Sequence, residues 1–249
     1  MIPISDDNTG RRTAPVVTWA LIAANAFVFV FLQGLGTNQK FTLAYATVPY
    51  EILTGRDVAQ SIPVRDEYGR QRGSIDLQPT PIPVFLTLLT SMFMHGGLAH
   101  ILGNMLYLHV FGDNVEDALG HGRFLVFYLL CGTLAGLAHV LTTALTHTGV
   151  LLPSLGASGA ISGVLAGYVL LFPHRRVRVL WLYSLIDVPA ILSIGVWFLF
   201  QLISGLGMLG GASSGVAYGA HVGGFLAGLI LVKPFASGAR RAAAAGPWA

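Results

Sequence analysis

The sequence predicts an all-α, polytopic membrane protein, a bundle of six transmembrane helices. Hydrophobic residues make up 54% of the 249 residues and charged residues only 10%, against roughly 25% charged in a typical soluble domain. No Asp, Glu, Lys or Arg occurs from Phe124 through His174, or from Val188 through Val232. Each run is about twice the ~20 residues that one spanning helix needs, and in lipid such continuous segments satisfy their backbone polar groups as helices.

The hydrophobic pattern also divides the chain. Residues 1–14 are polar and lack the apolar core and cleavage site of a secretory signal, so we expect a cytoplasmic N-terminal segment. Residues 15–233 are expected to form one six-span domain, and residues 234–249 a disordered cytoplasmic tail. The spans are expected at about 15–34, 95–112, 124–145, 155–172, 189–206 and 216–232.

The connections between the spans differ in length and charge. The first, residues 37–83, is long and carries acidic and basic residues in balance, so we expect it to be functional or partly folded on the surface. Polar residues from Asp113 to Arg123 predict a short turn after the second span. Val177–Ile186 is apolar but flanked by charge, which favours a segment along the membrane interface. Asp187 followed by Pro189 predicts the start of the fifth helix.

Basic residues predict the orientation of the bundle. With the N-terminus in the cytoplasm, the arginines and lysines beside the spans lie inside, whereas residues 146–154 and 207–215 carry no charge and lie outside. Both termini are then cytoplasmic, the long first loop is extracytoplasmic, and we expect the plasma membrane of a bacterium. The net charge of +3 reflects these topology signals and does not indicate a nucleic-acid partner. A single cysteine, Cys131, excludes a disulfide framework.

Three polar side chains are expected at one depth in the membrane. Each of the three spans ends on the cytoplasmic side at a charged residue. At a helical rise of 1.5 Å per residue, Ser158, His221 and His100 lie about 18–25 Å above those charged residues. In a hydrocarbon core of roughly 30 Å, all three then lie in the outer half. Unpaired polar groups there cost several kcal/mol each, so we expect them to face one another or a water-filled cavity.

Rows of small residues predict close contact between the fourth and sixth spans. The rows are Gly159, Gly163 and Gly167, and Ala220, Gly224 and Gly228. Ser158 directly precedes the first row and His221 directly follows the start of the second, so packing along the rows brings hydroxyl and imidazole toward hydrogen-bond distance. Because serine is a poor nucleophile without an adjacent base, this pattern predicts a catalytic pair, Ser158 and His221.

The second span supplies candidate hydrogen-bond donors. His100 and Asn104 are four residues apart and therefore share one helical face. With the backbone N–H of Ser158, their side chains are expected to donate to the oxyanion of a tetrahedral intermediate. The expected supporting residues are Gly156, Gly159 and Gly224. No metal, nucleotide or redox cofactor is indicated.

Four stretches of the chain carry a resemblance to a known family. They are His95-Gly-Gly-Leu-Ala-His100-Ile-Leu-Gly-Asn104, Phe111 to Gly120, Gly156-Ala-Ser158-Gly159 and Ala220-His221-Val-Gly223-Gly224. In this order they resemble the rhomboid intramembrane serine proteases, over about residues 15–233. The resemblance implies a six-helix bundle, a Ser158–His221 dyad without a catalytic carboxylate, and an oxyanion site with His100 and Asn104. It also implies substrates that are single-span membrane proteins, cut in or just outside the lipid bilayer.

The chain departs from the family's pattern at two places. Many members carry a Trp-Arg pair in the first loop, whereas residues 37–94 contain none. Some members place an aromatic residue four positions after the nucleophile, where it stacks on the histidine; this chain has Ser162 there. The histidine is then expected to be oriented differently, by water or by a backbone group.

Other interpretations of the same residues are less favoured. A zinc site formed by His95, His100 and His221 lacks an H-E-x-x-H pattern and a carboxylate partner. A small transporter would carry polar groups across the whole bilayer depth, and often an inverted repeat. A non-catalytic rhomboid relative that only binds membrane helices would lack the serine or the histidine. Trp197 and Phe198 are expected to be apolar bulk, or a gate if the fifth span moves.

Overall fold

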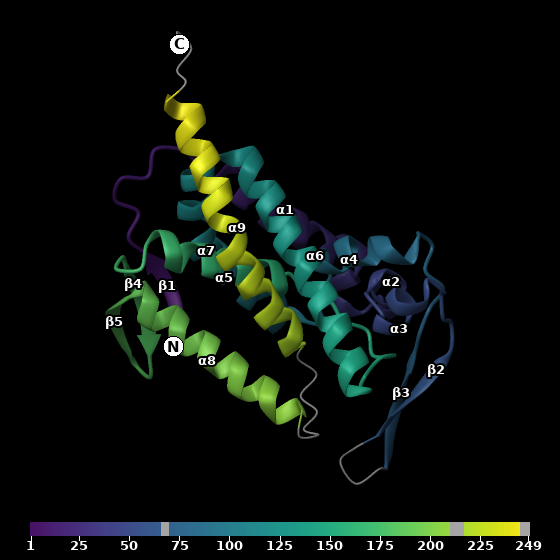
Figure 1. Ribbon diagram of the computed structural model, residues 1–249. Helices are drawn as coiled ribbons and strands as arrows, with labels where there is room; N and C mark the ends of the chain where they lie inside the picture. Colours follow the sequence, from purple (N-terminus) through teal and green to yellow (C-terminus); the bar gives the residue numbers. More distant parts are fainter. Residues whose placement is uncertain (66–69, 210–216, 245–249) are drawn as a thin grey trace.

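Helices make up most of the computed structural model, which describes residues 1–65, 70–209 and 217–244 (Figure 1). The helices are α1 (Val16–Phe27), α2 (Gln39–Tyr45), α3 (Pro49–Thr54), α4 (Thr87–Thr90), α5 (Leu98–Leu119), α6 (His121–Thr146), α7 (Ser158–Leu171), α8 (Ala190–Leu209) and α9 (Tyr218–Ala244). The strands are β1 (Ile2–Asp6), β2 (Ser61–Arg65), β3 (Gln71–Asp76), β4 (Arg176–Trp181) and β5 (Ser184–Pro189). The helical prediction is therefore confirmed, but the prediction of an all-α chain is wrong.

Several of these helices have the composition of membrane spans. Among the described residues, α6 and the Tyr218–Ala236 part of α9 are long and apolar enough to cross a bilayer. Val84–Phe93 and α5 meet at an 81° bend and count as a third span if they form one. Three shorter apolar helices accompany them, over Val16–Leu32, Ser158–Leu171 and Ala190–Gly205. Large apolar side chains such as Phe31 and Ile230 remain exposed on the helix surfaces, as expected where lipid is the solvent.

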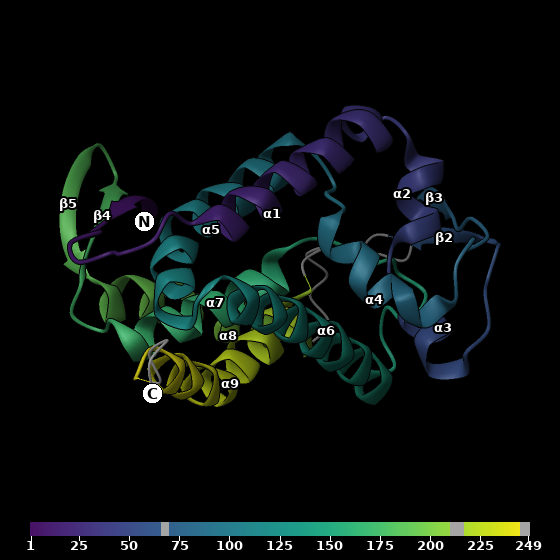
Figure 2. The same ribbon diagram turned by 90° about the horizontal axis from the view of Figure 1, so that it is seen from above.

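The long first loop is partly folded, which is one of the two alternatives that the sequence analysis gives for it. It contains α2, α3 and the antiparallel pair β2–β3. These elements gather at one end of the bundle, and the sheet of β1, β4 and β5 lies at the opposite end (Figures 1 and 2). The side-chain amide of Gln33 ties this loop region to the bundle. It donates to Thr42 Oγ1 in α2 and to the His95 carbonyl, and it accepts the His95 N–H, each at 2.9 Å.

Two expected boundaries are corrected by the structure, and a third lies largely outside the described residues. The polar residues from Asp113 onward do not form a turn: α5 continues to Leu119, and the break is at Gly120, whose φ is +80°. Asp187 does not begin the fifth helix but lies in β5, where its carboxylate pairs with Arg178 at 2.8 Å, and α8 begins at Ala190. The expected turn at residues 207–215 lies largely outside the described residues; its first part, through Leu209, is helical.

The apolar segment Val177–Ile186 forms most of a β-hairpin, and its location along the membrane interface stays a prediction. Val177 and Val179 are fully buried and alternate with exposed arginines, which is the period-two pattern of a strand with one covered face. β4 pairs antiparallel with β5 on one side and with β1 on the other, so the N-terminal segment is part of this sheet.

The helix of the expected sixth span does not end at Lys233. The helix α9 continues through Pro234 to Ala244, so residues 234–244 are not a disordered tail; residues 245–249 lie outside the described part. Proline removes one helical hydrogen bond and usually ends a helix. Here the ring of Phe235 contacts Phe127 of α6 edge-on, 5.8 Å between centroids, and so the residue after the proline is packed on the bundle.

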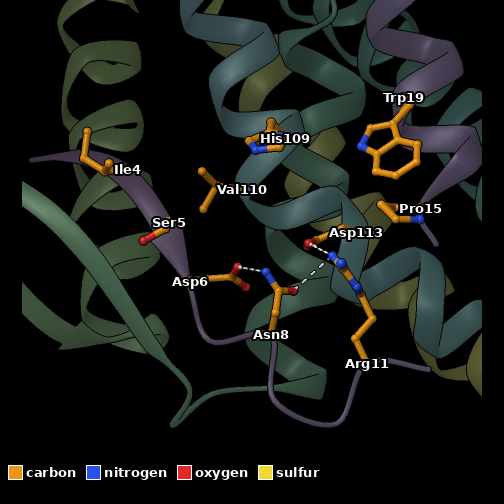
Figure 3. Close-up of a pocket in the computed structure, with 10 residues that line it drawn as sticks. All are labelled: Ile4, Ser5, Asp6, Asn8, Arg11, Pro15, Trp19, His109, Val110 and Asp113. Carbon is orange, nitrogen blue, oxygen red and sulfur yellow. Dashed lines mark hydrogen bonds and ion pairs between the residues drawn. The ribbon is translucent and has the colours of Figure 1, made fainter. Parts of the chain in front are cut away.

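Acidic residues at the end of α5 bind the N-terminal segment. The buried carboxylate of Glu116 accepts the backbone N–H groups of Val17 and Thr18, which caps the first turn of α1. Arg11 pairs with Asp113 beside a cavity of about 210 Å³, and Asn8 links Arg11 to Asp6 (Figure 3). Asp113 and Glu116, expected in a turn, therefore anchor β1 and α1 to α5.

The glycine rows of α7 and α9 are in backbone contact, as the sequence predicts. A β-carbon placed on Gly224 would lie 2.1 Å from the carbonyl oxygen of Gly159, and one on Gly228 would lie 2.3 Å from that of Gly163. The helix α6 packs against the same helix crossing, because a β-carbon on Gly163 would lie 2.5 Å from Cys131 Cβ. Any side chain at these positions would force the helices apart.

We expect Gly224→Ala to lower the free energy of unfolding by about 1–3 kcal/mol, the usual cost of overpacking a tight core. Gly195→Ala on α8 is the matched control, because its β-carbon would meet nothing within 4 Å. Since alanine favours a helix by roughly 0.5–1 kcal/mol over glycine, this control is expected to keep or raise stability. Thermal unfolding in detergent micelles, followed by tryptophan fluorescence, measures both; equal midpoints would contradict the packing argument.

Burial raises the pKa of the Asp6 carboxyl from 3.8 to about 6. Between about pH 4 and 6, the Asp6 carboxyl is therefore protonated in the folded sheet but ionised in the unfolded chain. The attachment of β1 is most stable below about pH 4 and weakens as the pH rises through 6. Hydrogen exchange of the β1 amides at pH 5 and 7, corrected for intrinsic rates, is expected to show this change.

Asp6→Asn is expected to remove the pH dependence of β1 protection. Asp7→Asn is the control and is expected to preserve it, because the hydrogen bond with Thr9 lowers the pKa of Asp7, which stays ionised throughout this range. Identical pH profiles in wild type and Asp6→Asn would contradict the assignment.

Candidate active site

Ser158 and His221 meet where α7 and α9 cross. Ser158 is the first residue of α7, and His221 lies in the first turns of α9. The serine Oγ is 2.8 Å from His221 Nε2 and both side chains are half-buried. The sequence predicts this contact and the structure contains it. Such a pair has the geometry that a serine nucleophile and its base require.

His100 and Asn104 line the same pocket from α5. The pocket has a volume of about 370 Å³ and is lined by residues that include His100, Asn104, Ser158 and His221. Gly156 separates the His100 ring from the serine: a β-carbon there would lie 2.9 Å from His100 Nε2 and 3.7 Å from Ser158 Oγ. With a φ of +126°, Gly156 also holds a backbone conformation that suits glycine.

The side chains of His100 and Asn104 are oriented by local hydrogen bonds. His100 Nδ1 accepts the N–H of Gly96 at 3.2 Å, and its Nε2 is the nitrogen nearer Gly156. Asn104 Nδ2 donates to the carbonyl of His100 at 3.1 Å, and an amide nitrogen carries a second N–H donor. The remaining predicted members of the site, Gly159 and Gly224, form the helix contact beneath it.

The chain segment before Ser158 is attached to the first loop and to the start of the α5 region. Thr47 and Ser154 exchange backbone hydrogen bonds of 3.0 and 2.8 Å, and the Gly156 N–H donates to Ser91 at 2.9 Å. Ser162, where some family members carry an aromatic residue, donates instead to the Ser158 carbonyl at 2.7 Å. Hydrogen bonds therefore hold the start of α7 on both sides of Ser158.

The sequence prediction missed a polar side chain of this site. Gln201 of α8 is buried, and its Oε1 lies 2.6 Å from His221 Nδ1. Water or a backbone group was expected to orient the imidazole; a side-chain amide does so instead. The available signal was that Gln201 is the only Asn or Gln between Val188 and Val232, an apolar stretch in which an amide needs a partner.

Aromatic residues close the site from α8 and α5. Trp197 lies one helical turn before Gln201 and lines the pocket, with its ring centroid 6.0 Å from that of His221 and 6.3 Å from that of Tyr107. Phe198 is instead packed inside, stacked on Phe225 at 4.0 Å. Of the two expected gate residues, only Trp197 therefore faces the pocket.

His95 is not part of the pocket lining. Its side chain is fully buried, and its ring meets that of His100 edge-on at 5.1 Å between centroids. In the described ranges, no group of three or more His, Cys, Asp or Glu residues is arranged to hold a metal ion.

Comparison with known proteins identifies the family. The Rhomboid domain matches residues 84–237, which include every predicted site residue. The chain is 31% identical to Rhomboid protein 1, mitochondrial, of Saccharomyces cerevisiae over 62% of its own length and 43% of the relative's. It is 34% identical to Rhomboid protease GluP of Bacillus subtilis over 59% of its length and 26% of the relative's. The chain belongs to the rhomboid family and is an integral membrane protein.

A third relative is Presenilin-associated rhomboid-like protein, mitochondrial, of Homo sapiens, 36% identical over 38% of this chain and 24% of the relative. The chain thus spans less than half of the length of these curated relatives. Two are named mitochondrial and one comes from a bacterium, so the comparisons do not support the expected bacterial plasma membrane over a mitochondrial one.

Proposed function

We propose that this chain is an intramembrane serine endopeptidase that hydrolyses a peptide bond in or near the transmembrane segment of single-span membrane proteins. The observation that supports it best is the 2.8 Å contact between Ser158 Oγ and His221 Nε2, made by two helices whose surrounding segments carry no charge. The family includes proteins named as proteases, which favours the same activity. Residues 15–233 would form the catalytic domain.

The reaction is acyl transfer. His221 Nε2 takes the proton of Ser158 Oγ as the oxygen attacks the scissile carbonyl, and an Oγ–C bond forms. The C–N bond then breaks as His221 returns this proton to the leaving amine. Water, deprotonated by His221, next attacks the acyl ester. The ester Oγ–C bond breaks, His221 returns this proton to Ser158 Oγ, and the new carboxyl terminus is released.

Three donors would stabilise the oxyanion of the tetrahedral intermediates. The N–H of Ser158 belongs to the first turn of α7, where backbone donors lack helical partners and the helix dipole favours negative charge. His100 Nε2 and the second N–H of Asn104 are the side-chain donors of the same pocket. Because these groups are already oriented by their neighbours, they need little reorganisation when the charge develops.

The length of α7 favours a site below the membrane surface. Its 14 residues rise about 21 Å, less than the roughly 30 Å of the hydrocarbon core, so an N-terminal serine lies inside the membrane if the other end is at the interface. With six spans and both termini cytoplasmic, this pocket opens toward the extracytoplasmic face. Water can then reach the acyl-enzyme.

A substrate helix must unwind locally, because its carbonyl groups are otherwise engaged in helical hydrogen bonds. We therefore expect substrates with Gly, Ala or Pro near the membrane boundary, where glycine and proline weaken the helix. Trp197 on α8 and Tyr107 on α5 line the pocket and contact each other, and a movement of α8 that separates these two rings is the expected entry route.

Ser158→Ala is expected to lower cleavage of a single-span model substrate in liposomes by at least about 10³-fold, because no other group in the pocket replaces the nucleophile. It is also expected to abolish labelling by a serine-reactive fluorophosphonate. Ser184→Ala, in the exposed hairpin, is the control and should change neither. Unchanged cleavage by Ser158→Ala would refute the protease proposal, and flux of solute without cleavage would favour a transporter.

Asn104→Ala is expected to lower kcat by about 10²–10³-fold with little change in KM, since an oxyanion donor acts mainly in the transition state. Leu102→Ala, an exposed residue of the same helix, is the control. The two constants are measured with the same liposome substrate. A change confined to KM would place Asn104 in substrate binding and not at the oxyanion.

A further inference from the structure

Both ring nitrogens of His221 have side-chain partners. Nε2 faces Ser158 Oγ at 2.8 Å, and Nδ1 faces Gln201 Oε1 at 2.6 Å. A neutral imidazole has one N–H donor and one acceptor nitrogen, and an amide oxygen only accepts. The hydrogen therefore belongs on Nδ1, which leaves the lone pair of Nε2 directed at the serine hydroxyl.

We propose that Gln201 is a positioning residue: its amide oxygen keeps His221 in the Nδ1–H tautomer and aims Nε2 at Ser158. This inference rests on the proposed function, and it assigns the orienting contact that the sequence left open. Gln201 acts through the imidazole and touches neither nucleophile nor substrate.

The surroundings of the imidazole support a neutral orienting group. In the part of the chain that the structure describes, the ionisable side chains near it include His100 from α5, His139 from α6 and Tyr218, whose ring meets it edge-on at 6.2 Å. None of these is a carboxylate. A buried charge in this setting would carry a large desolvation cost, whereas an amide provides an acceptor without charge.

The helix α8 contacts the ring with one face. Trp197 and Gln201 are four residues apart and so project from the same side, and both reach His221. Ser158 and His221 belong to α7 and α9, so the base is oriented by a third helix. The orientation of the imidazole consequently depends on where α8 lies.

The first test compares three variants of α8 on the liposome substrate. Gln201→Leu removes the acceptor and is expected to lower kcat by about 10–100-fold with KM nearly unchanged, as is usual for the loss of an orienting contact. Gln201→Glu keeps an oxygen acceptor but adds a carboxyl group that is costly to bury, so it is expected to recover only part of that loss. Ile203→Ala, exposed on the same helix, is the control and should behave as wild type.

The second test reads the tautomer directly and needs no activity. The ¹⁵N shifts of histidine-labelled protein in micelles are expected to show His221 protonated on Nδ1 in wild type and in Ser158→Ala, and a tautomer mixture in Gln201→Leu. An Nε2–H tautomer in wild type overturns the proposal, even if Gln201→Leu fails to fold.

The two proposals fail differently. If Ser158→Ala is inactive but Gln201→Leu keeps the wild-type kcat, the positioning role is wrong and the protease remains. If Ser158→Ala still cleaves, the protease proposal is wrong, whatever the tautomer of His221.

Discussion

The close approach of α7 and α9 at their glycine rows determines the rest of the site. The space for a β-carbon at Gly224 is occupied by the carbonyl of Gly159, so the two backbones are as near as helices can come. Ser158 and His221 each sit next to this contact in sequence. Short side chains at the crossing thus place a hydroxyl and an imidazole within 2.8 Å. Larger residues would separate the helices by more than a hydrogen bond can span.

Contacts at both ends of the bundle keep that crossing in place. At the site end, Thr47 and Ser91 bind the backbone just before α7 through Ser154 and Gly156. At the other end, the Ala190 N–H donates to Arg175 at 2.9 Å, which joins the start of α8 to the residue preceding β4. Thr47 and Ser91 are far apart in sequence from the residues that they bind, and strand β1 of the sheet is likewise far from its partner β4. They therefore add long-range constraints to a membrane bundle in which helix packing alone has little hydrophobic driving force.

The sequence was sufficient for the helical core and for the Ser158–His221 contact, because charge-free runs, small-residue rows and helical rise are local properties. The β-hairpin was missed because a short apolar run between charged residues also fits a segment along the membrane interface. Its pairing with β1 was missed because β1 lies about 170 residues before β4. Pro234 was misjudged because its disruptive effect is local, whereas the packing of Phe235 on α6 is tertiary. Gln201 was missed for the same reason: an amide in an apolar helix signals a partner, but the spacing does not say which one.

An active site inside a lipid bilayer is most stable when its resting state carries no charge, because a buried ion is costly. In the described pocket the serine, the neutral imidazole and the amides of Asn104 and Gln201 carry none, so the resting state avoids the cost of a buried ion. On the proposed mechanism an imidazolium and an oxyanion form together. The amide oxygen of Gln201 faces the first, and the N-terminus of α7 with His100 and Asn104 faces the second. Neutral dipoles oriented in advance can thus do in a membrane what a catalytic carboxylate does in water-soluble triads.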